Sequence, residues 1–219
     1  MGICYIVGAA PSSPKFKKAE NDLVIAADGG LDSLTCSGIV PDIIVGDMDS
    51  VKQLYSVPGA EVIRVPVEKD DTDTELAVKI AEARGYRKFI IYGCLGGLLD
   101  HTLGNIALMK GLALRGCRAV FVQDIWGAAG ISDGEIRFDK GARGRASVIS
   151  LSDNAKGVTI RGLKYTLENK ELPSTVTLGV SNSFTGENGS ISVENGALCI
   201  YTGLENLLKH SDVFDKAAE

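Results

Sequence analysis

Two aspartates stand out as residues able to do chemistry, because Asp47 and Asp49 directly follow the apolar run at residues 43–46. A run rich in β-branched residues predicts a buried strand. In an extended backbone, side chains two residues apart point to the same side. Two carboxylates about 6 Å apart repel by about 3 kcal/mol at an effective dielectric constant near 20. Such a pair is suited to a hard cation with oxygen ligands, and the alternative is a solvated acidic turn capped by Ser50.

Other acidic residues also follow predicted strands. They are Asp28, Asp70 with Asp73, and Asp100. In open α/β sheets, ligands bind outside the carboxyl ends of the strands, so four separate loops bring acids to one edge. Because no His or Cys has ligand spacing, the cluster favours Mg²⁺ over zinc.

The first half of the chain alternates strands and helices. Strands are predicted at residues 3–7, 23–27, 43–46, 61–65, 88–92 and 118–123. A short helix from Leu31 closes at Gly38, a second begins at the capping box of Thr72 and Glu75, and a third covers residues 101–115. This order predicts an α/β fold, with a Rossmann-like three-layer domain and a mainly parallel sheet.

After a predicted connection at residues 125–130, the alternation of strands and helices gives way to a series of short strands. Short strands are predicted at residues 135–138, 146–151, 158–161, 175–180, 190–193 and 198–201. Asn195-Gly196 is a strong hairpin signal. This pattern predicts a small C-terminal β-sandwich, so we expect a catalytic domain over residues 1–130 and a second domain over 131–219.

Composition sets further limits on function. The 219 residues are 45% hydrophobic and 23% charged, with a net charge of -5, which favours neither nucleic acid nor a membrane as partner. The five cysteines are odd in number and scattered, so reduced thiols in a cytoplasmic protein are expected. Neither a signal peptide nor a transmembrane helix is expected from the N-terminal residues.

Glycine pairs follow two of the predicted strands and are suited to phosphate binding. Gly29-Gly30 and Gly96-Gly97, with Gly93, offer main-chain N–H groups to a phosphate. The sequence has neither a P-loop motif nor a dinucleotide fingerprint. The residues therefore indicate a Mg²⁺–nucleotide enzyme of an unusual class.

Six motifs in this order resemble the thiamine pyrophosphokinase family. They are Ala27-Asp28-Gly29-Gly30, Gly46-Asp47-Met48-Asp49-Ser50, Asp70-Asp71-Thr72-Asp73, Gly96-Gly97-Leu98-Leu99-Asp100-His101, Gly162-Leu163-Lys164-Tyr165-Thr166-Leu167 and Val180-Ser181-Asn182-Ser183-Phe184. The resemblance implies an N-terminal α/β catalytic domain, a C-terminal sandwich that helps to bind thiamine, and a homodimer with active sites between subunits. It also implies transfer of the terminal pyrophosphoryl group of ATP to the thiamine hydroxyl, with release of AMP.

Site roles follow from the residues and the resemblance together. We expect four carboxylates to bind Mg²⁺ and ATP: Asp47, Asp49, Asp70 and Asp73. Asp49, Asp73 and Asp100 are the expected catalytic residues, where Asp100 holds the metal, accepts the hydroxyl proton or only caps a helix. Nucleotide or substrate contacts are expected from Asp28, Gly29, Gly30, Gly96, Gly97, His101 and Asn105. For thiamine, Tyr165 offers an aromatic face to a flat cation, and Ser181 and Asn182 offer hydrogen bonds.

The sequence also departs from the family pattern. Many relatives have arginine where Leu98 stands, a glutamate is common at Ser183, and some carry lysine near Leu76. Two alternatives therefore stay open: a Mg²⁺-dependent phosphotransferase or pyrophosphotransferase acting on another alcohol such as a pterin, and a non-catalytic nucleotide or thiamine sensor.

Overall fold

The computed structural model describes residues 2–47, 57–66, 68 and 70–214. The chain divides into two compact units, of which the first comprises Met1–Ile106 with Phe121–Asp124. The second unit comprises Ala107–Val120 with Ile125–Glu219, so the two halves of α3 and of β6 belong to different units. The sequence-based boundary at residue 130 instead assigned both elements to the first domain.

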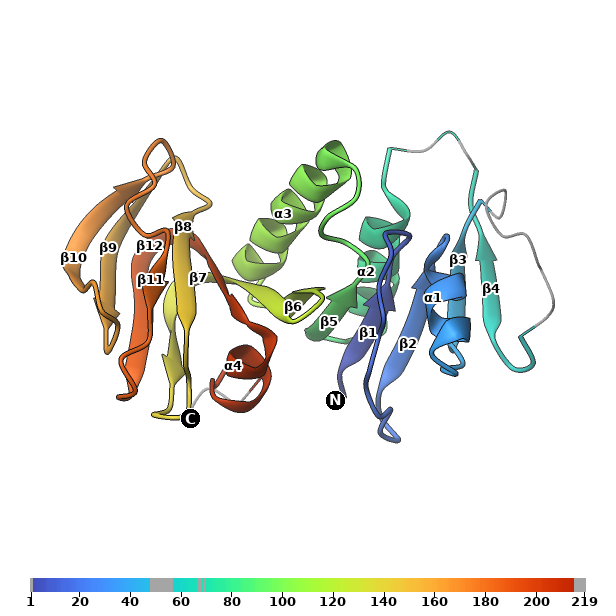
Figure 1. Ribbon diagram of the computed structural model, residues 1–219. Coiled ribbons are helices and arrows are strands. Elements are labelled where there is room, and N and C mark those ends of the chain that lie inside the picture. The colour runs from blue at the N-terminus through green and yellow to red at the C-terminus, as the bar shows by residue number, and fades with distance from the viewer. Residues whose placement is uncertain (1, 48–56, 67, 69, 215–219) are drawn as a thin grey trace. The chain divides into compact units, whose positions relative to one another are not determined.

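The first unit is built on parallel strands, which Figure 1 shows in blue to green. Its strands and helices are β1 (Cys4–Val7), β2 (Leu23–Ala27), α1 (Gly30–Cys36), β3 (Ile43–Gly46), β4 (Glu61–Arg64), α2 (Asp73–Ala83) and β5 (Lys88–Tyr92). It also contains parts of α3 (Leu99–Leu114) and β6 (Arg118–Gln123), which it shares with the second unit. Five strands lie in the order β5-β1-β2-β3-β4, and each of the four neighbouring pairs is parallel. Their carboxyl ends therefore share one edge, as the alternation of strands and helices predicted.

Strand composition explains the core of this unit. Strands β1, β2 and β3 are buried along their whole length, because a parallel sheet covered on both faces excludes water from every side chain. Strand β4 is mostly exposed, as suits the end of the row. Between β1 and β2 the chain crosses without a helix, and Phe16 from this crossing stacks on Tyr5 with ring centroids 3.8 Å apart.

Helix ends match the sequence signals. The main-chain N–H of Glu75 donates to the Thr72 hydroxyl at 3.2 Å, so the predicted cap of α2 is confirmed. After α1, α2 and α3 the chain turns at Gly38, Gly85 and Gly116, each with a positive φ. At each turn the next N–H bonds back to a carbonyl of the last helical turn, which is the Schellman arrangement that favours glycine.

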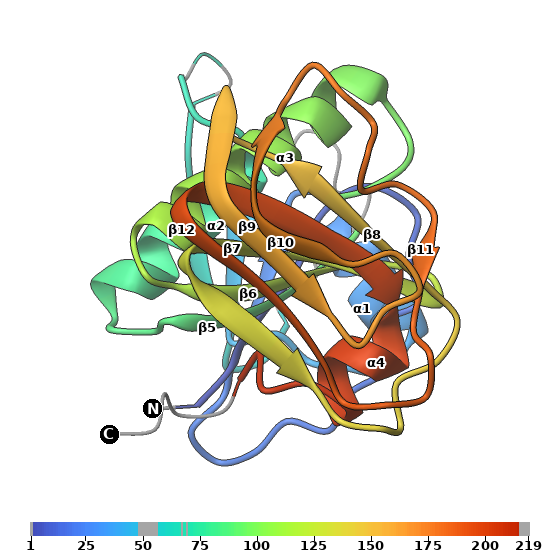
Figure 2. The same ribbon diagram turned by 90° about the vertical axis from the view of Figure 1, so that its left-hand side faces the viewer.

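The second unit is antiparallel and carries one short helix. Its elements are β7 (Trp126–Phe138), β8 (Arg145–Ser150), β9 (Asn154–Arg161), β10 (Leu167–Pro173), β11 (Asn182–Ser183), β12 (Gly189–Gly203) and α4 (Leu204–Lys209). Strand β12 pairs with β7 along one side; on its other side it pairs first with β9 and then with β8. Figure 2 shows this long strand running through the unit.

Three local predictions in this half were wrong. Asn195-Gly196 was expected to form a hairpin, but β12 continues through it as a single strand, with a register shift between Val193 and Ala197. Residues 125–130 were expected to be a connection, but β7 already begins at Trp126, because its small residues Gly127, Ala128 and Ala129 pack as a buried strand. Residues 175–180 were expected to be a strand but form turns and irregular backbone. Their register beside β8 is fixed by the Val148 N–H, which donates to the Gly179 carbonyl at 2.9 Å.

Candidate active site

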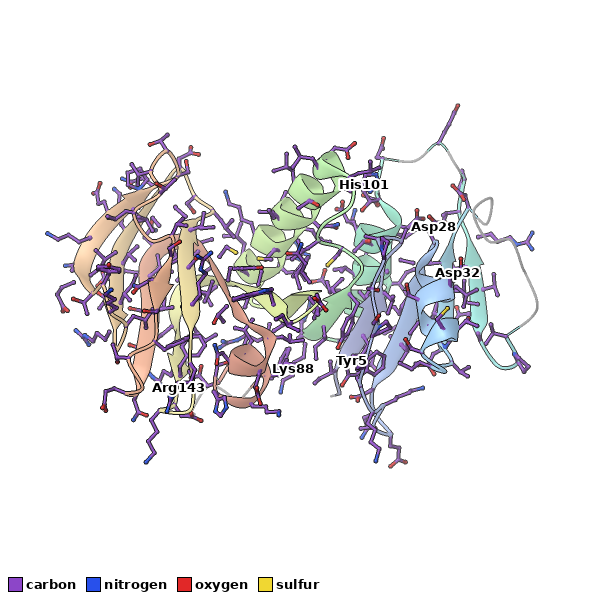
Figure 3. The ribbon with its side chains drawn as sticks, viewed as in Figure 1. Tyr5, Asp28, Asp32, Lys88, His101 and Arg143 are labelled. Atoms are coloured by element: carbon purple, nitrogen blue, oxygen red, sulfur yellow. The ribbon has the colours of Figure 1, made fainter. Side chains whose placement is uncertain are left out.

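A cavity of about 450 Å³ opens at the carboxyl edge of the parallel strands in the first unit. Its walls come from the loops after β1, β2, β3 and β5 and from the first turns of α2 and α3. The lining residues are Ala9, Ala10, Pro11, Ala27, Asp28, Asp47, Asp71, Thr72, Asp73, Thr74, Gly93, Cys94, Gly96, Gly97, Leu98, His101 and Asn105. Figure 3 shows Asp28 and His101 at this upper edge.

The cavity collects many of the residues that the sequence singled out. It brings together Asp28, Asp47, Asp73, Gly96, Gly97, His101 and Asn105. Four other predicted residues do not line it: Gly29, Gly30, Asp70 and Asp100. Asp49 lies outside the described residues.

Two of the residues outside the lining have local roles instead. Gly30 is buried, and a Cβ at this position would stand 1.8 Å from the Val7 carbonyl oxygen. Its missing side chain therefore allows α1 to begin against β1, and its contact with phosphate stays a prediction. The exposed carboxylate of Asp100 accepts a hydrogen bond from the N–H of His101 at 2.8 Å, in the first turn of α3.

Asp28 has the most unusual environment in the cavity. Its backbone adopts a positive φ of 49°, a conformation that costs a non-glycine residue about 1–2 kcal/mol. Its main-chain N–H donates to the Val45 carbonyl at 2.8 Å, which fixes the loop after β2 beside the end of β3. The Oδ1 atom is buried and has no hydrogen-bond partner among the described residues. A buried acceptor without a partner costs about 1–3 kcal/mol, so Asp28 is suited to a cation or donor supplied by a ligand.

Negative charge dominates the lining. Four carboxylates contribute to it, Asp28, Asp47, Asp71 and Asp73, whereas no lysine or arginine is among its described residues. Asp71 is compensated from outside, because the Lys79 ammonium lies 2.5 Å from its Oδ1. That hydrogen bond raises the pKa of Lys79 above its ordinary value. A lining rich in carboxylate oxygens favours a divalent cation over a free phosphate.

A complete metal site is not formed by the described residues alone. Among them, no group of three or more His, Cys, Asp or Glu side chains is arranged to hold an ion. The orphaned oxygen of Asp28 and the oxygen-only donor set nevertheless fit Mg²⁺, which is generally bound by one or two carboxylates together with substrate phosphates.

The loop after β5 forms another wall of the acidic cavity, and contacts with β1 and α3 hold it in place. A Cβ on Gly93 would lie 2.3 Å from the Gly8 carbonyl oxygen, so the main chains of β1 and β5 touch just beyond their paired residues. From α3, the buried Asn105 side chain donates to the Cys94 carbonyl at 2.8 Å. The amide nitrogen of Asn105 thereby fixes the loop that carries Gly96 and Gly97, and its predicted contact with the nucleotide stays a prediction.

Cys94 is the thiol that lines the cavity, and it is not a nucleophile. Its Sγ atom lies 3.2 Å from the Ile91 carbonyl oxygen, to which it donates. Burial raises the pKa of this thiol far above its ordinary value. The neutral thiol is a packing group, in agreement with the expectation of reduced core cysteines.

In the second unit, the residues expected to contact thiamine lie close together. Tyr165 is 60% exposed, whereas Asn182 is only 4% exposed and is hydrogen bonded to the main chain of Tyr165. Ser181 is exposed and has a positive φ of 64°, and its N–H donates to the buried Ser147 hydroxyl at 3.1 Å.

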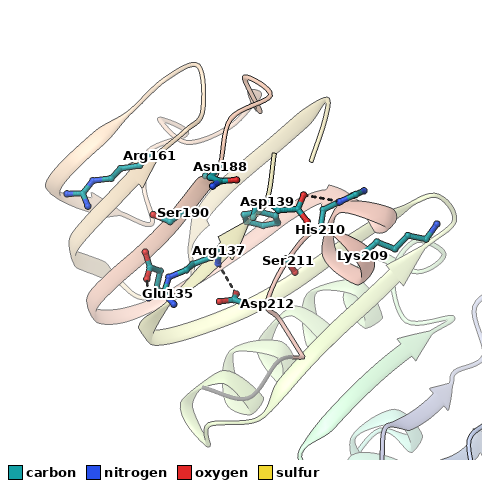
Figure 4. A pocket seen from close by; sticks show the side chains of 12 residues that line it. Glu135, Arg137, Asp139, Arg161, Asn188, Ser190, Lys209, His210, Ser211 and Asp212 are labelled. Carbon is teal, nitrogen blue, oxygen red and sulfur yellow. Dashed lines mark hydrogen bonds and ion pairs between the residues drawn. The ribbon is translucent and has the colours of Figure 1, made fainter. Parts of the chain in front are cut away.

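A second hollow, of about 620 Å³, lies over β7, β12 and α4 (Figure 4). Its charged groups are compensated within the protein: Arg137 pairs with Glu135 at 2.6 Å, and His210 lies 3.1 Å from Asp139. Lys209 and Arg161 are likewise paired with glutamates. With its charges satisfied, this surface is less suited to a charged ligand than the acidic cavity of the first unit.

Sequence reasoning missed several lining residues. Asp71 and Thr74 stand beside predicted ones at the start of α2, and Ala9, Ala10 and Pro11 follow β1. Their position directly after a strand or at a helix start was the available signal. The fold and cavity together define an α/β protein with an acidic cavity at the carboxyl edge of its parallel strands.

Comparison with known proteins identifies the family. The profile of the "Thiamin pyrophosphokinase, catalytic domain" matches residues 16–121, and that of the "Thiamin pyrophosphokinase, vitamin B1 binding domain" matches residues 135–198. A thiamine pyrophosphokinase from Bacillus subtilis is 30% identical over 186 residues, which are 82% of this chain and 86% of the relative. The chain belongs to the thiamine pyrophosphokinase family.

Solved structures agree with this assignment. The crystal structure of thiamine pyrophosphokinase from Bacillus subtilis superposes with a TM-score of 0.83 and 26% identity, covering 92% of this chain and 99% of that one. Thiamin pyrophosphokinase from Geobacillus thermodenitrificans gives a TM-score of 0.80 and 28% identity, covering 92% and 97%. The family resemblance drawn from the six motifs is thereby confirmed.

Proposed function

We propose that this protein transfers the pyrophosphoryl group of ATP to the hydroxyl of thiamine, giving thiamine diphosphate and AMP. The observation that carries the proposal is the match of both family domains, in order, on a chain whose first unit has an acidic cavity. In the reaction, the thiamine hydroxyl oxygen forms a bond to the β-phosphorus of ATP. The bond from that phosphorus to the oxygen bridging the α-phosphate breaks, and AMP leaves with the bond's electron pair.

Mg²⁺ would be held by Asp28, Asp47 and Asp73, together with Asp49. When bound, the ion neutralises the phosphate oxygens, which is the main requirement of phosphoryl transfer. Asp70, also predicted as a ligand, is exposed and outside the cavity lining, so we place it in a supporting position at most. The support for this set is its oxygen-only chemistry and the orphaned Oδ1 of Asp28.

The remaining cavity residues bind and orient the substrates. Gly96 and Gly97 offer main-chain N–H groups to the phosphates, and the capped start of α2 presents the positive end of its helix dipole. Asp100 or His101, at the start of α3, accepts the proton of the attacking hydroxyl. Gly29 stays a predicted substrate contact beside Asp28.

Domain organisation follows the same proposal. Residues 1–130 would form a Rossmann-like three-layer catalytic domain, and residues 131–219 a β-sandwich that binds thiamine through Tyr165 and Ser181. The matched ranges of the two family profiles, which fall on either side of residue 130, support this division.

We further propose a homodimer with its active sites between subunits. Large apolar side chains are exposed in each unit: Leu98, Leu99 and Leu103 at the start of α3, and Ile149, Leu178 and Val180 around β8. Large apolar side chains that group in exposed positions are typical of interaction sites, and these side chains support the proposal. None of the helices in the described chain is long and apolar enough to cross a membrane. We propose a cytoplasmic location, supported by five cysteines that form no disulfide.

The direct test is incubation with ATP, Mg²⁺ and thiamine, followed by chromatography of the products. Equal amounts of AMP and thiamine diphosphate are expected. The matched control replaces thiamine with a hydroxymethyl pterin, which should give no AMP. ADP as the product, or turnover of the pterin alone, would overturn the proposal.

A further inference from the structure

The exposed ring of Tyr165 stands on a rigid base in the second unit. Leu163 and Phe184 are both buried and form an antiparallel bridge. Next to them, the Lys164 N–H donates to the Ser183 carbonyl at 2.9 Å. The main chain is therefore fixed up to the residue before Tyr165.

Asn182 extends this base to Tyr165 itself. Its Oδ1 atom accepts from the N–H groups of Tyr165 and Ser183, both at 2.9 Å. Its Nδ2 atom donates to the Tyr165 carbonyl at 2.6 Å. The amide thus holds both main-chain polar groups of Tyr165 in the way that a neighbouring strand would. With 4% of its surface exposed, Asn182 has little area left for a substrate.

The ring that this clamp holds is not used for packing. Tyr165 is 60% exposed, although its main chain is fixed. The Lys164 ammonium lies 5.2 Å from the ring centroid, within the range of a cation–π contact. A solvent-facing aromatic ring that projects from a fixed main chain and already attracts a cation is suited to stack on a flat cationic ligand.

We propose that Asn182 is a positioning residue, which acts through Tyr165 to fix the ring that stacks on the cationic ring of the substrate. This inference rests on the proposed function, and it gives Asn182 a role other than the predicted direct hydrogen bond to thiamine. A ring fixed before binding loses less conformational freedom in the complex, which raises affinity without any added contact.

The chain supplies a matched control in Asn206, a second buried asparagine of the same unit. Its Oδ1 accepts from the Arg143 N–H at 3.1 Å, and its Nδ2 donates to the Arg143 carbonyl at 2.8 Å. Asn182→Ala and Asn206→Ala therefore remove the same kind of clamp from different places. A general loss of stability would affect both variants alike.

A double-mutant cycle on the KM for thiamine is the first test. Tyr165→Ala should raise this KM about five- to thirtyfold, the range expected for loss of a partly desolvated cation–π contact. Asn182→Ala should raise it by at least threefold in the native background and by less than 1.5-fold in the Tyr165→Ala background. The KM for ATP should stay constant in both, and Asn206→Ala should leave both KM values constant. Equal effects of Asn182→Ala in the two backgrounds would overturn the proposal, because Asn182 would then act independently of the ring.

A spectroscopic test separates this inference from the proposed function. Trp126 is the one tryptophan of the chain, so Trp126→Phe with Tyr165→Trp places a single indole at position 165. Adding Asn182→Ala should lower its fluorescence anisotropy without substrate, whereas adding Asn206→Ala should not. Lowered anisotropy in a protein that does not convert thiamine would uphold the positioning role and reject only the proposed function. Unchanged anisotropy in an active enzyme would reject the positioning role.

Discussion

The side-chain amide of Asn105 donates to the main-chain carbonyl of Cys94 at 2.8 Å, which ties α3 to the loop after β5. This one hydrogen bond joins a buried helix position to the wall of the acidic cavity. Under the proposed function it relates packing to catalysis, because the phosphate contacts proposed for Gly96 and Gly97 require that their loop is held in place.

Replacing Asn105 with leucine should therefore impair catalysis more than folding. The Cys94 carbonyl loses its donor, which costs about 1–3 kcal/mol of stability. Turnover should fall by more than tenfold, or about 1.4 kcal/mol in the activation free energy. The control is Thr35→Val, which removes another helical side-chain donor, to the Leu31 carbonyl, away from the cavity. Native turnover in Asn105→Leu would return Asn105 to a packing role.

Removing the charge of Asp28 should lower activity without lowering the stability of the fold. Asparagine tolerates a positive φ, so Asp28→Asn should fold with unchanged or slightly higher melting temperature while turnover falls by more than tenfold. Asp32 on α1 is exposed and outside the cavity lining, so Asp32→Asn is the matched control and should keep full activity. Equal turnover of the two variants would remove Asp28 from the site.

Nucleotide binding should depend on the divalent cation. Since the described lining has carboxylates but no lysine or arginine, ATP alone meets repulsion. Calorimetry should show at least tenfold weaker binding of ATP in EDTA than in Mg²⁺, or about 1.4 kcal/mol. Equal affinity under both conditions would contradict the metal assignment.

Alkaline pH should destabilise the first unit through Tyr92. Burial raises the pKa of its hydroxyl from 10.0 to about 12. Between these values the unfolded chain has lost the proton while the folded protein retains it, so the free energy of unfolding falls as pH rises. The loss should be about 3 kcal/mol. Denaturant titrations from pH 9.5 to 12 should show that the free energy of unfolding declines less steeply with pH in Tyr92→Phe than in the parent protein. Tyr165→Phe, which changes an exposed tyrosine, is the control and should decline as the parent does. Identical slopes in all three proteins would refute this account.

Local rules predicted much of the fold and part of the cavity. Thr72 and Gly85 marked the ends of α2 correctly because caps depend on a few neighbouring residues. Asp28, Asp47 and Asp73 were predicted to meet because parallel strands share one carboxyl edge. The strand that begins at Trp126 was missed, because its small residues resemble a linker until the pairing with β12 is known.

Side-chain partners could not be predicted in the same way. Asn105 was expected to reach the nucleotide because it lies one turn from His101 on the same helix face, and Asn182 was expected to offer hydrogen bonds to thiamine. Both ligand contacts stay predictions. In the structure both amides hold main-chain groups of residues distant in sequence, Cys94 and Tyr165. Such contacts depend on tertiary packing, which no local pattern encodes.

The fate of labelled ATP tests the central claim most directly. With ATP labelled at the β-phosphorus, Mg²⁺ and thiamine, the account predicts that the label appears in thiamine diphosphate and is absent from the nucleotide product, AMP. A kinase that moves only the terminal phosphate would leave the label in ADP. Label retained in ADP would contradict pyrophosphoryl transfer.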